Sequence, residues 1–307
     1  MARPAEPVWF DNKDKQATQT MKLSAIRKQL DANAAFTMIE IAISLAVIGF
    51  ALVAIIGIMP TAMQTQKDNR QETIINQDST ILLEAIRTGA LGVDDLTNYV
   101  FAITNYSTLY PEAGGPTTTE YGYTFKDSSA NGSAMTPPFP IISGARIIGL
   151  LSTPRYIDAS TGSTRRYISN YVVAFVRSMS GAASEKYPQT NPEAMTLSFN
   201  YRVAVEVADA TYYDAQWTNY TAISDTNSPL YQERYRYFMV SRNLQQNLHD
   251  LRLVFRWPLF NNNTIGNGKQ TYRTMVGGNL MQTNDAGYPN GVSNLFYFQP
   301  RNYVKAP

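Results

Sequence analysis

The sequence predicts an α+β protein: a long N-terminal helix, membrane-spanning in its first half, packed on an antiparallel β-sheet outer domain with long loop insertions. Two observations predict this fold. Residues 41–63 contain no charged side chain, and a helix of that length can cross a bilayer. Several later segments alternate apolar and polar residues with the period of a half-buried strand. One sheet packed on an extended helix is the simplest arrangement of these elements.

The composition excludes several classes of site and partner. The 307 residues carry a formal net charge of +2, and the basic excess lies within residues 1–35, so the rest of the chain is neutral. A neutral body gives no electrostatic reason to expect a nucleic acid partner, and none is expected. The chain contains no cysteine, which excludes disulfides, cysteine-ligated zinc and thiol chemistry.

The uncharged run predicts a transmembrane helix. Its 23 residues span roughly 35 Å as a helix, slightly more than the hydrocarbon core of a bilayer. A secretory signal peptide has an apolar stretch of only about 7–15 residues. Lys22, Arg27 and Lys28 precede the run, whereas Lys67 and Arg70 after it are mixed with acids. The positive-inside rule therefore places the N-terminus in the cytoplasm and the bulk of the chain outside.

The helix is expected to cover residues 36–92, with its transmembrane part in residues 36–63. Gly89 and Gly92 are the expected stop signals, and Pro60 is expected to kink the helix or break it locally. Beyond the membrane, apolar residues continue on one helical face. They are Ile74, Ile75, Ile81, Leu82, Ala85 and Ile86.

Residues 93–307 are expected to form a β-rich domain outside the cytoplasm. Residues 105–140 are rich in Gly, Pro, Ser, Thr and Tyr and are interpreted as a long connection. The alternation is clean where Tyr201, Val203, Val205 and Val207 share one face, and imperfect over residues 251–257. Strands are predicted at residues 145–152, 169–179, 195–208, 248–259, 269–276 and 293–300.

The residues Ala35-Phe36-Thr37-Met38-Ile39-Glu40 lead directly into the apolar run. With basic residues before it and an unbroken apolar helix after it, this segment resembles the start of type IV prepilins, a family that includes the pseudopilins of type II secretion. The resemblance implies that residues 1–35 are a leader. It also implies that a prepilin peptidase cuts between Ala35 and Phe36 and methylates the new amine of Phe36.

The resemblance further implies that Glu40, with Thr37 in the same motif, acts in filament assembly. Glu40 would pair with the N-terminal amine of a neighbouring subunit. A carboxylate in a membrane helix costs roughly 2.5–3.5 kcal/mol, and an opposite charge in a low-dielectric environment offsets that cost. The alternative is a plain signal anchor, in which Glu40 snorkels to the lipid headgroups.

The function implied by the resemblance is that of a non-enzymatic filament subunit, a minor pilin or pseudopilin, without a cofactor or metal. Its partners would be the prepilin peptidase, other pilin or pseudopilin subunits and inner membrane lipid. It would cross the inner membrane once, with a periplasmic C-terminal domain, and enter a type IV pilus or a type II secretion-like pseudopilus on assembly. The alternative is a single-pass, signal-anchored envelope binding protein that does not polymerise.

The chain departs from the family pattern in its leader. Ala35 stands where the family usually has Gly, and Met21 is an alternative start to Met1 that would give a short basic leader.

Towards the C-terminus, residues 247–276 look like the closing hairpin of minor pilins and minor pseudopilins. The overall layout is also similar to the larger pilin-like cassette proteins of verrucomicrobia.

Other candidate sites have ordinary explanations. A Ser-His-Asp catalytic set would need His249, the single histidine. Asp250 follows it directly and would point to the opposite face of a strand, so a satisfied or surface histidine is expected. Residues 263–271 approximate a phosphate-binding loop but lack its first Gly and its Ser/Thr, so a hairpin turn is expected. Asp94-Asp95 and residues 284–291 lack the spaced acidic ligands of a calcium loop.

Aromatic residues gather after the third predicted strand. Packing in the core or the sheet is the expected explanation, and the alternative is an exposed surface that binds sugar or protein. These residues are Tyr212, Tyr213, Trp217 and Tyr220.

Overall fold

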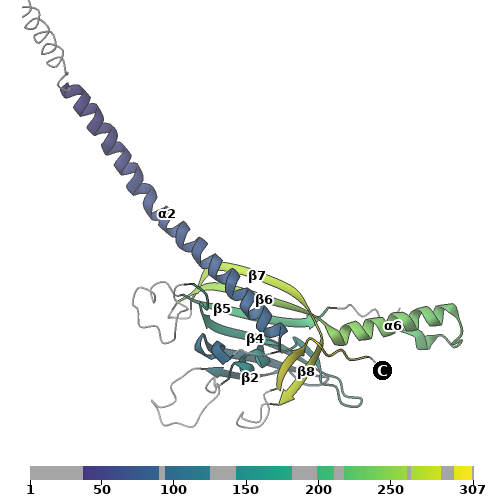
Figure 1. The fold of residues 1–307 in the computed structure, drawn as a ribbon. Helices are drawn as coiled ribbons and strands as arrows, with labels where there is room; N and C mark the ends of the chain where they lie inside the picture. Colours follow the sequence, from purple (N-terminus) through teal and green to yellow (C-terminus); the bar gives the residue numbers. More distant parts are fainter. Residues whose placement is uncertain are drawn as a thin grey trace, which may run out of the picture. The chain divides into compact units, whose positions relative to one another are not determined.

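The computed structural model shows a long apolar helix and a seven-stranded antiparallel sheet, which is an α+β fold (Figure 1). The chain forms two compact units, Met1–Lys67 and Asp68–Pro307. The structure describes residues 37–89, 94–124, 143–181, 199–210, 218–260, 264–284 and 294–305.

Helix α2 (Met38–Arg87) is a single helix of 50 residues that runs through Pro60 without interruption. Of the two outcomes expected at Pro60, the local break is therefore wrong, and a kink stays a prediction. A proline removes one backbone donor, and the helix continues on both sides of it. The predicted stop at Gly89 is confirmed, because Gly89 has a positive φ of 70°. A Cβ there would also lie 2.2 Å from the carbonyl oxygen of Phe298, so only glycine fits.

The part of α2 that belongs to the second unit buries one face against the sheet. Ile75, Leu82 and Ile86 are almost fully buried, together with polar Asp78 and Ser79. Ile81, which was expected on this face, is 44% exposed. Successive helical residues are about 100° apart, so Leu82 and its neighbours at positions 75, 78, 79 and 86 share the face while Ile81 points away from it.

The main sheet has the strand order β2-β1-β4-β5-β6-β7, and β3 pairs with β4. Every pair of neighbouring strands is antiparallel. A separate two-stranded sheet joins β8 and β9. The strands are β1 (Val100–Pro111), β2 (Thr117–Thr124), β3 (Tyr156–Asp158), β4 (Arg166–Arg177), β5 (Asn200–Asp209), β6 (Leu248–Leu259), β7 (Ile265–Gly277), β8 (Asn279–Asn284) and β9 (Asn294–Gln299).

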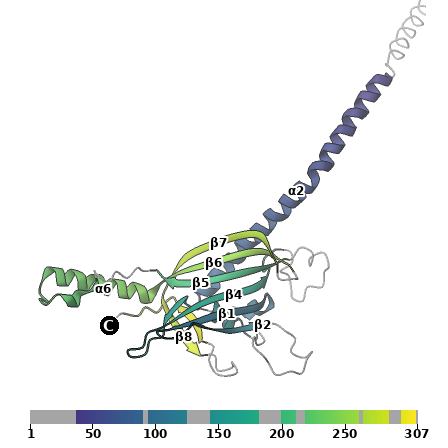
Figure 2. The ribbon, with the colours of Figure 1, turned by 180° about the vertical axis from the view of Figure 1, so that it is seen from behind.

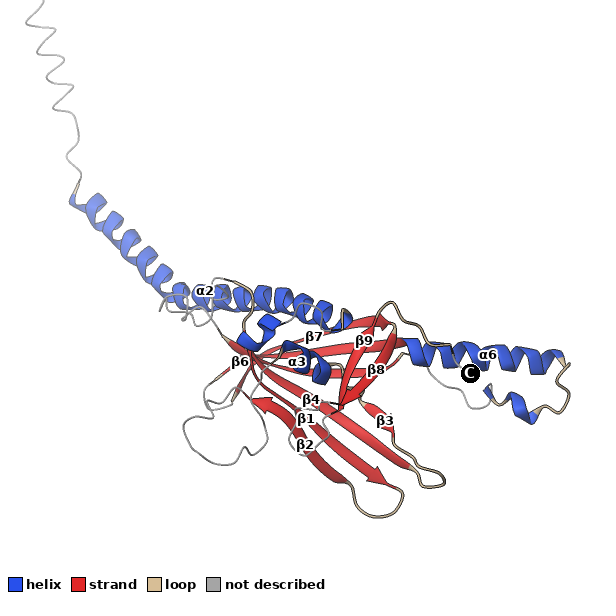
Figure 3. Cartoon of the chain, turned by 60° about the horizontal axis from the view of Figure 1, so that its bottom comes forward, coloured by secondary structure: helices blue, strands red, loops and turns tan. Residues whose placement is uncertain are grey.

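The helical elements of the second unit divide into two groups. The second half of α2 and helix α3 (Gly144–Leu151) lie on one face of the main sheet (Figures 1 and 3). The opposite face of the sheet turns towards the viewer in Figure 2. Helix α6 (Pro229–Asn247) extends away from the sheet beside the short 3-10 helix η3 (Tyr220–Ala222). A second short 3-10 helix, η1 (Asp94–Asn98), precedes β1.

Five of the six predicted strands are confirmed: β4, β5, β6, β7 and β9 lie at the expected positions, and residues 195–198 are outside the described part of the chain. The predicted strand at 145–152 is wrong, because these residues form α3. Ser143 caps this helix by accepting the Ala145 N–H at 3.2 Å. A short apolar run cannot be assigned to helix or strand by periodicity alone, and here the helix packs both of its flanks on the sheet and β9.

The predicted long connection over residues 105–140 is wrong in its first part, which contains most of β1 and all of β2. The abundant Thr and Tyr of this segment favour strands, although their polarity suggested a loop. Residues 125–142 lie outside the described residues. Helix α6 was not expected, even though Ser228 followed by Pro229 is an ordinary helix start.

The core lies between the sheet and the helices α2 and α3. Tyr201, Val203, Val205 and Val207 all point into it, as expected. Strand β6 alternates more regularly than its sequence indicated, because its odd-numbered residues from 249 to 259 are buried. Trp257 lies against the backbone of Gly268, where a Cβ would come within 2.5 Å of the indole ring. Gly268 of β7 therefore makes room for the aromatic side chain of the neighbouring strand.

Asp78 is a buried acid at the interface of α2 with the sheet. Its Oδ2 accepts the backbone N–H of Met179 at 2.9 Å. Burial raises the pKa of this carboxyl, although hydrogen bonds from Ser180 and Met179 favour its charged form. Nearby, Asn76 accepts hydrogen bonds from Tyr272 and Gln270 of β7. These polar contacts fix the position of α2 along the sheet.

We expect the second unit to fold without the first. A fragment beginning at Thr65 contains the whole unit Asp68–Pro307 and the complete buried face of α2. It should be a soluble monomer that unfolds cooperatively in urea. A control fragment beginning at Thr88 lacks Ile75, Leu82 and Ile86 and should show no cooperative transition. Cooperative unfolding of both fragments would contradict the role assigned to α2 in the core.

The buried carboxyl of Asp78 predicts opposite effects for two substitutions in the Thr65 fragment. Asp78→Ala leaves the Met179 N–H without its acceptor and should lower the free energy of unfolding by about 1–3 kcal/mol. Asp78→Asn keeps an acceptor oxygen and removes the charge, so at pH 7 it should be at least as stable as the parent. Because the folded pKa is raised, the parent loses stability as pH rises from about 4 through that pKa.

The advantage of Asp78→Asn should therefore grow between pH 4 and pH 7, as measured by urea denaturation. If Asp78→Ala and Asp78→Asn lowered the free energy of unfolding equally at pH 7, the acid would be required in its charged form.

Candidate functional site

The start of α2 is the first candidate site. Thr37 and Glu40 form a capping box: Glu40 Oε2 accepts the Thr37 N–H at 3.0 Å and the Thr37 hydroxyl at 2.9 Å. The Glu40 N–H in turn donates to the Thr37 hydroxyl at 3.3 Å. This arrangement satisfies two backbone donors that the first turn of a helix leaves without partners. Ala35 and Phe36, the expected cleavage and methylation residues, lie outside the described residues.

The capping box gives Glu40 a local role that the sequence analysis missed. Its signature is Ser or Thr followed three positions later by Glu or Gln, before an apolar run. Thr37-Met38-Ile39-Glu40 matches that signature. A pairing role in assembly therefore has to be tested against helix capping as well as against headgroup contact.

The segment that follows presents apolar side chains on every face. All residues from Thr37 to Met63 are exposed, and Phe50 is 80% exposed. Among the described residues, α2 is the one helix that is long and apolar enough to span a membrane. A helix that is apolar all round requires a nonpolar environment, supplied by lipid or by other helices.

His249 is a buried histidine on the core side of β6. Its Nδ1 lies 3.7 Å from Asp209 Oδ1, and its ring packs 5.4 Å from that of Phe298. The pKa of Asp209 is lowered by its interaction with His249 and by a hydrogen bond from Gln245. Asp250 points to the other face, as expected, and pairs with Arg273 at 2.7 Å. The surroundings of His249 thus match a packed histidine.

The remaining candidates of the sequence fall on ordinary structure. Residues 265–271, including Gly266 and Gly268, belong to strand β7, which pairs with β6, so they form neither a phosphate-binding loop nor the expected hairpin turn. Residue 263 lies outside the described residues. In the described part of the chain, no group of three or more His, Cys, Asp or Glu side chains is placed to hold a metal ion. Of the calcium candidates, Asp94-Asp95 lie in η1, and residues 285–290 are outside the described residues.

Tyr220 packs against α6, with its ring 5.6 Å from that of Tyr231, 5.2 Å from Tyr235 and 5.1 Å from Phe238. Tyr220 therefore packs on a helix that extends away from the sheet, and not in the core or the sheet as expected. Tyr212, Tyr213 and Trp217 lie outside the described residues.

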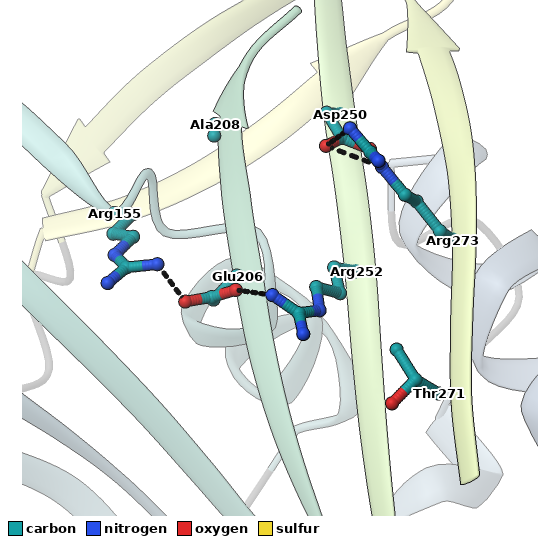
Figure 4. Close-up of a pocket in the computed structure, with 7 residues that line it drawn as sticks. All are labelled: Arg155, Glu206, Ala208, Asp250, Arg252, Thr271 and Arg273. Carbon is teal, nitrogen blue, oxygen red and sulfur yellow. Dashed lines mark hydrogen bonds and ion pairs between the residues drawn. The ribbon is translucent and has the colours of Figure 1, made fainter.

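The open face of the sheet is a second candidate site, which the sequence analysis did not identify. Glu206 on β5 lies between two arginines and pairs with Arg155 and, at 3.2 Å, with Arg252 of β6 (Figure 4). On the next strand, β7, Arg273 donates two hydrogen bonds of 2.8 Å to Asp250 of β6. These residues line a hollow of about 490 Å³. The charged residues were visible in the sequence, but only the strand register brings them together.

The chain matches no family model, and no curated protein or solved structure matches it.

Proposed function

We propose that this chain is a non-enzymatic filament subunit, a minor pilin or pseudopilin that assembles through its N-terminal helix. A prepilin peptidase would cut it between Ala35 and Phe36 and methylate Phe36. Until assembly the protein would be anchored in the inner membrane by α2, with its β-rich unit in the periplasm. Its partners would be inner membrane lipid and then the helices of other pilin or pseudopilin subunits.

The observation that carries the proposal is the division of α2 into two parts with different surroundings. The residues up to Met63 are apolar and exposed, whereas those from Gln71 to Ile86 contribute a buried face to the core of the second unit. One continuous helix thus serves both as an apolar segment and as a structural part of a folded domain. Such a chain can pass from lipid to contacts with like helices without unfolding its domain.

The second candidate function is an anchored binding protein of the envelope that does not polymerise. The capping box favours it, because it explains Glu40 without a neighbouring subunit. In that case α2 would serve as an anchor, and the open face of the sheet would carry the function. The two candidates differ in what happens to Phe36 and in whether the charge of Glu40 is needed.

Processing is the first test. Mass spectrometry of the protein extracted from membranes of its native cells should identify N-methylated Phe36 as the first residue. Replacing Ala35 with a bulky residue, as in Ala35→Leu, should block cleavage, while Ala35→Gly should permit it. An intact leader in cells with an active prepilin peptidase would contradict the proposal.

The charge of Glu40 is the second test. Glu40→Gln retains the capping box, because glutamine serves at the same helix position, but it removes the negative charge. If Glu40 pairs with a neighbour's amine, this variant should insert and be cleaved normally but fail to assemble, because an unpaired buried charge costs roughly 3–5 kcal/mol. Glu40→Val should behave in the same way, with membrane insertion improved by roughly 2–3 kcal/mol.

The control for this test is Thr37→Val, which removes the capping hydroxyl and keeps the charge. It should assemble, with some loss of helix stability of about 1 kcal/mol. The measurement is the fraction of each variant recovered in sheared filaments or as cross-linked oligomers. Normal assembly of Glu40→Gln together with failure of Thr37→Val would assign the motif to helix capping.

A further inference from the structure

The open face of the main sheet carries a row of three cations. Arg202 on β5 lies directly opposite Arg256 on β6, which lies directly opposite Lys269 on β7. Like charges at directly opposite positions repel each other and destabilise a sheet. No acid in the described part of the chain pairs with any of the three. Adjacent strands are about 4.8 Å apart, so the row offers a bound anion several donors within about 10 Å.

The second charged row on this face is also rich in cations. Arg252 lies opposite Arg273. Arg252 forms an ion pair with Glu206, and Arg273 forms one with Asp250. The residues that line the two hollows of this face therefore include six cations and two acids. The cations are Arg155, Arg202, Arg252, Arg256, Lys269 and Arg273. Because the chain beyond residue 35 is neutral overall, this excess is a local feature.

Tyrosines continue the same face across β1, β3 and β4. Tyr106 lies opposite Tyr171, and Tyr110 lies opposite Tyr167. Tyr156 on β3 lies opposite a residue of the same face of β4. These five rings are between 37% and 63% exposed. Exposed tyrosines in adjacent pairs offer flat apolar surfaces with a hydroxyl at one end, which is a composition typical of binding surfaces.

Tyr171 and Arg202 join the tyrosines to the cations. The Arg202 guanidinium donates to the Tyr171 hydroxyl at 2.6 Å, and its central carbon lies 6.0 Å from the ring centroid. Between the two charged rows the face is lined by the small or uncharged residues Ala204, Val254 and Thr271. A hollow of about 300 Å³ lies at this junction. The face thus combines aromatic surface, a hollow and unpaired cations in one continuous area.

We propose that this face binds an acidic polysaccharide in which carboxylate-bearing sugars alternate with neutral ones. The carboxylate would lie over Arg202, Arg256 and Lys269, since guanidinium groups bind carboxylates with two parallel hydrogen bonds. The sugar rings would lie on the tyrosines, whose apolar faces match the C–H surface of a pyranose.

The acids on the face favour this ligand over a nucleic acid. Glu206 and Asp250 accept hydrogen bonds from hydroxyl groups, and an ionised carboxylate has more acceptor positions than its arginine partners occupy. The same two acids would repel a nucleic acid, which carries a negative charge on every unit. An acidic peptide would satisfy the cations but would make no specific use of the paired tyrosines. This inference does not depend on polymerisation through α2.

The test uses the full chain in detergent micelles and fluorescently labelled hyaluronan oligosaccharides, in which glucuronate alternates with N-acetylglucosamine. Binding should be saturable and should weaken as salt is raised. Arg256→Ala and Lys269→Ala should each weaken it by about tenfold, because each removes a charge-assisted contact. Tyr106→Ala should weaken it while leaving its salt dependence unchanged. The folded state should tolerate Arg256→Ala, which relieves repulsion within the row.

The matched controls are Arg236→Ala on α6 and Tyr303→Ala near the C-terminus, which remove an exposed cation and an exposed tyrosine elsewhere. Both should bind hyaluronan normally, and dextran should not bind the parent protein. The proposal is overturned if hyaluronan does not bind, or if Arg256→Ala and Arg236→Ala behave alike. Tighter binding of poly-glutamate or of single-stranded DNA than of hyaluronan would also overturn it and assign the face to that ligand.

Discussion

The burial of α2 against the sheet, from Gln71 to Ile86, is the constraint on which the second unit depends. Ile75, Leu82 and Ile86 occupy the core, and Asp78 lies in the same buried stripe with its carboxylate on the Met179 N–H. Shifting the helix by one turn, or rotating it towards Ile81, would leave a buried carboxylate without a donor, at a cost of several kcal/mol. The apolar contacts make the packing favourable, and Asp78 makes its register unique.

Two consequences follow from this packing. Because α2 and α3 cover one face of the sheet, the strands need apolar residues mainly on that side, and the other side can carry Arg202, Arg256 and the tyrosines. Because the buried part of α2 begins near residue 71, the apolar residues before it contribute nothing to that core. Each large apolar side chain left in water costs roughly 1.5–3 kcal/mol, so this segment requires a nonpolar environment of its own.

The sequence predicted what depends on local periodicity. In β5 apolar and polar residues alternate cleanly, because only one face of the strand is buried. Burial alternates just as regularly in β6, but the apolar residue Val254 on its open face makes the sequence pattern look irregular. Helix α3 is short and apolar, so only its packing partners distinguish it from a strand. The row at Arg256 could not be predicted, because alternation shows which face a side chain occupies but not which strands are neighbours. The capping box could be predicted from the spacing of Thr37 and Glu40 alone, because both residues lie within one helical turn.

Helix capping and intermolecular pairing do not exclude each other at Glu40. In the capping box both hydrogen bonds from Thr37 end on Oε2, and no residue in the described part of the chain donates to Oε1. Capping turns the carboxylate towards the N-terminal end of α2 and restricts its rotamers. Cleavage at Ala35-Phe36 would create an amine at that same end of each subunit. The Glu40 carboxylate is already oriented by its own helix, and Oε1 remains available as an acceptor. The side chain therefore loses less conformational entropy on binding a neighbour's amine than an unrestrained side chain would. The hydrogen bond from the Thr37 backbone N–H, which Thr37→Val retains, would then be enough to orient Glu40 for assembly.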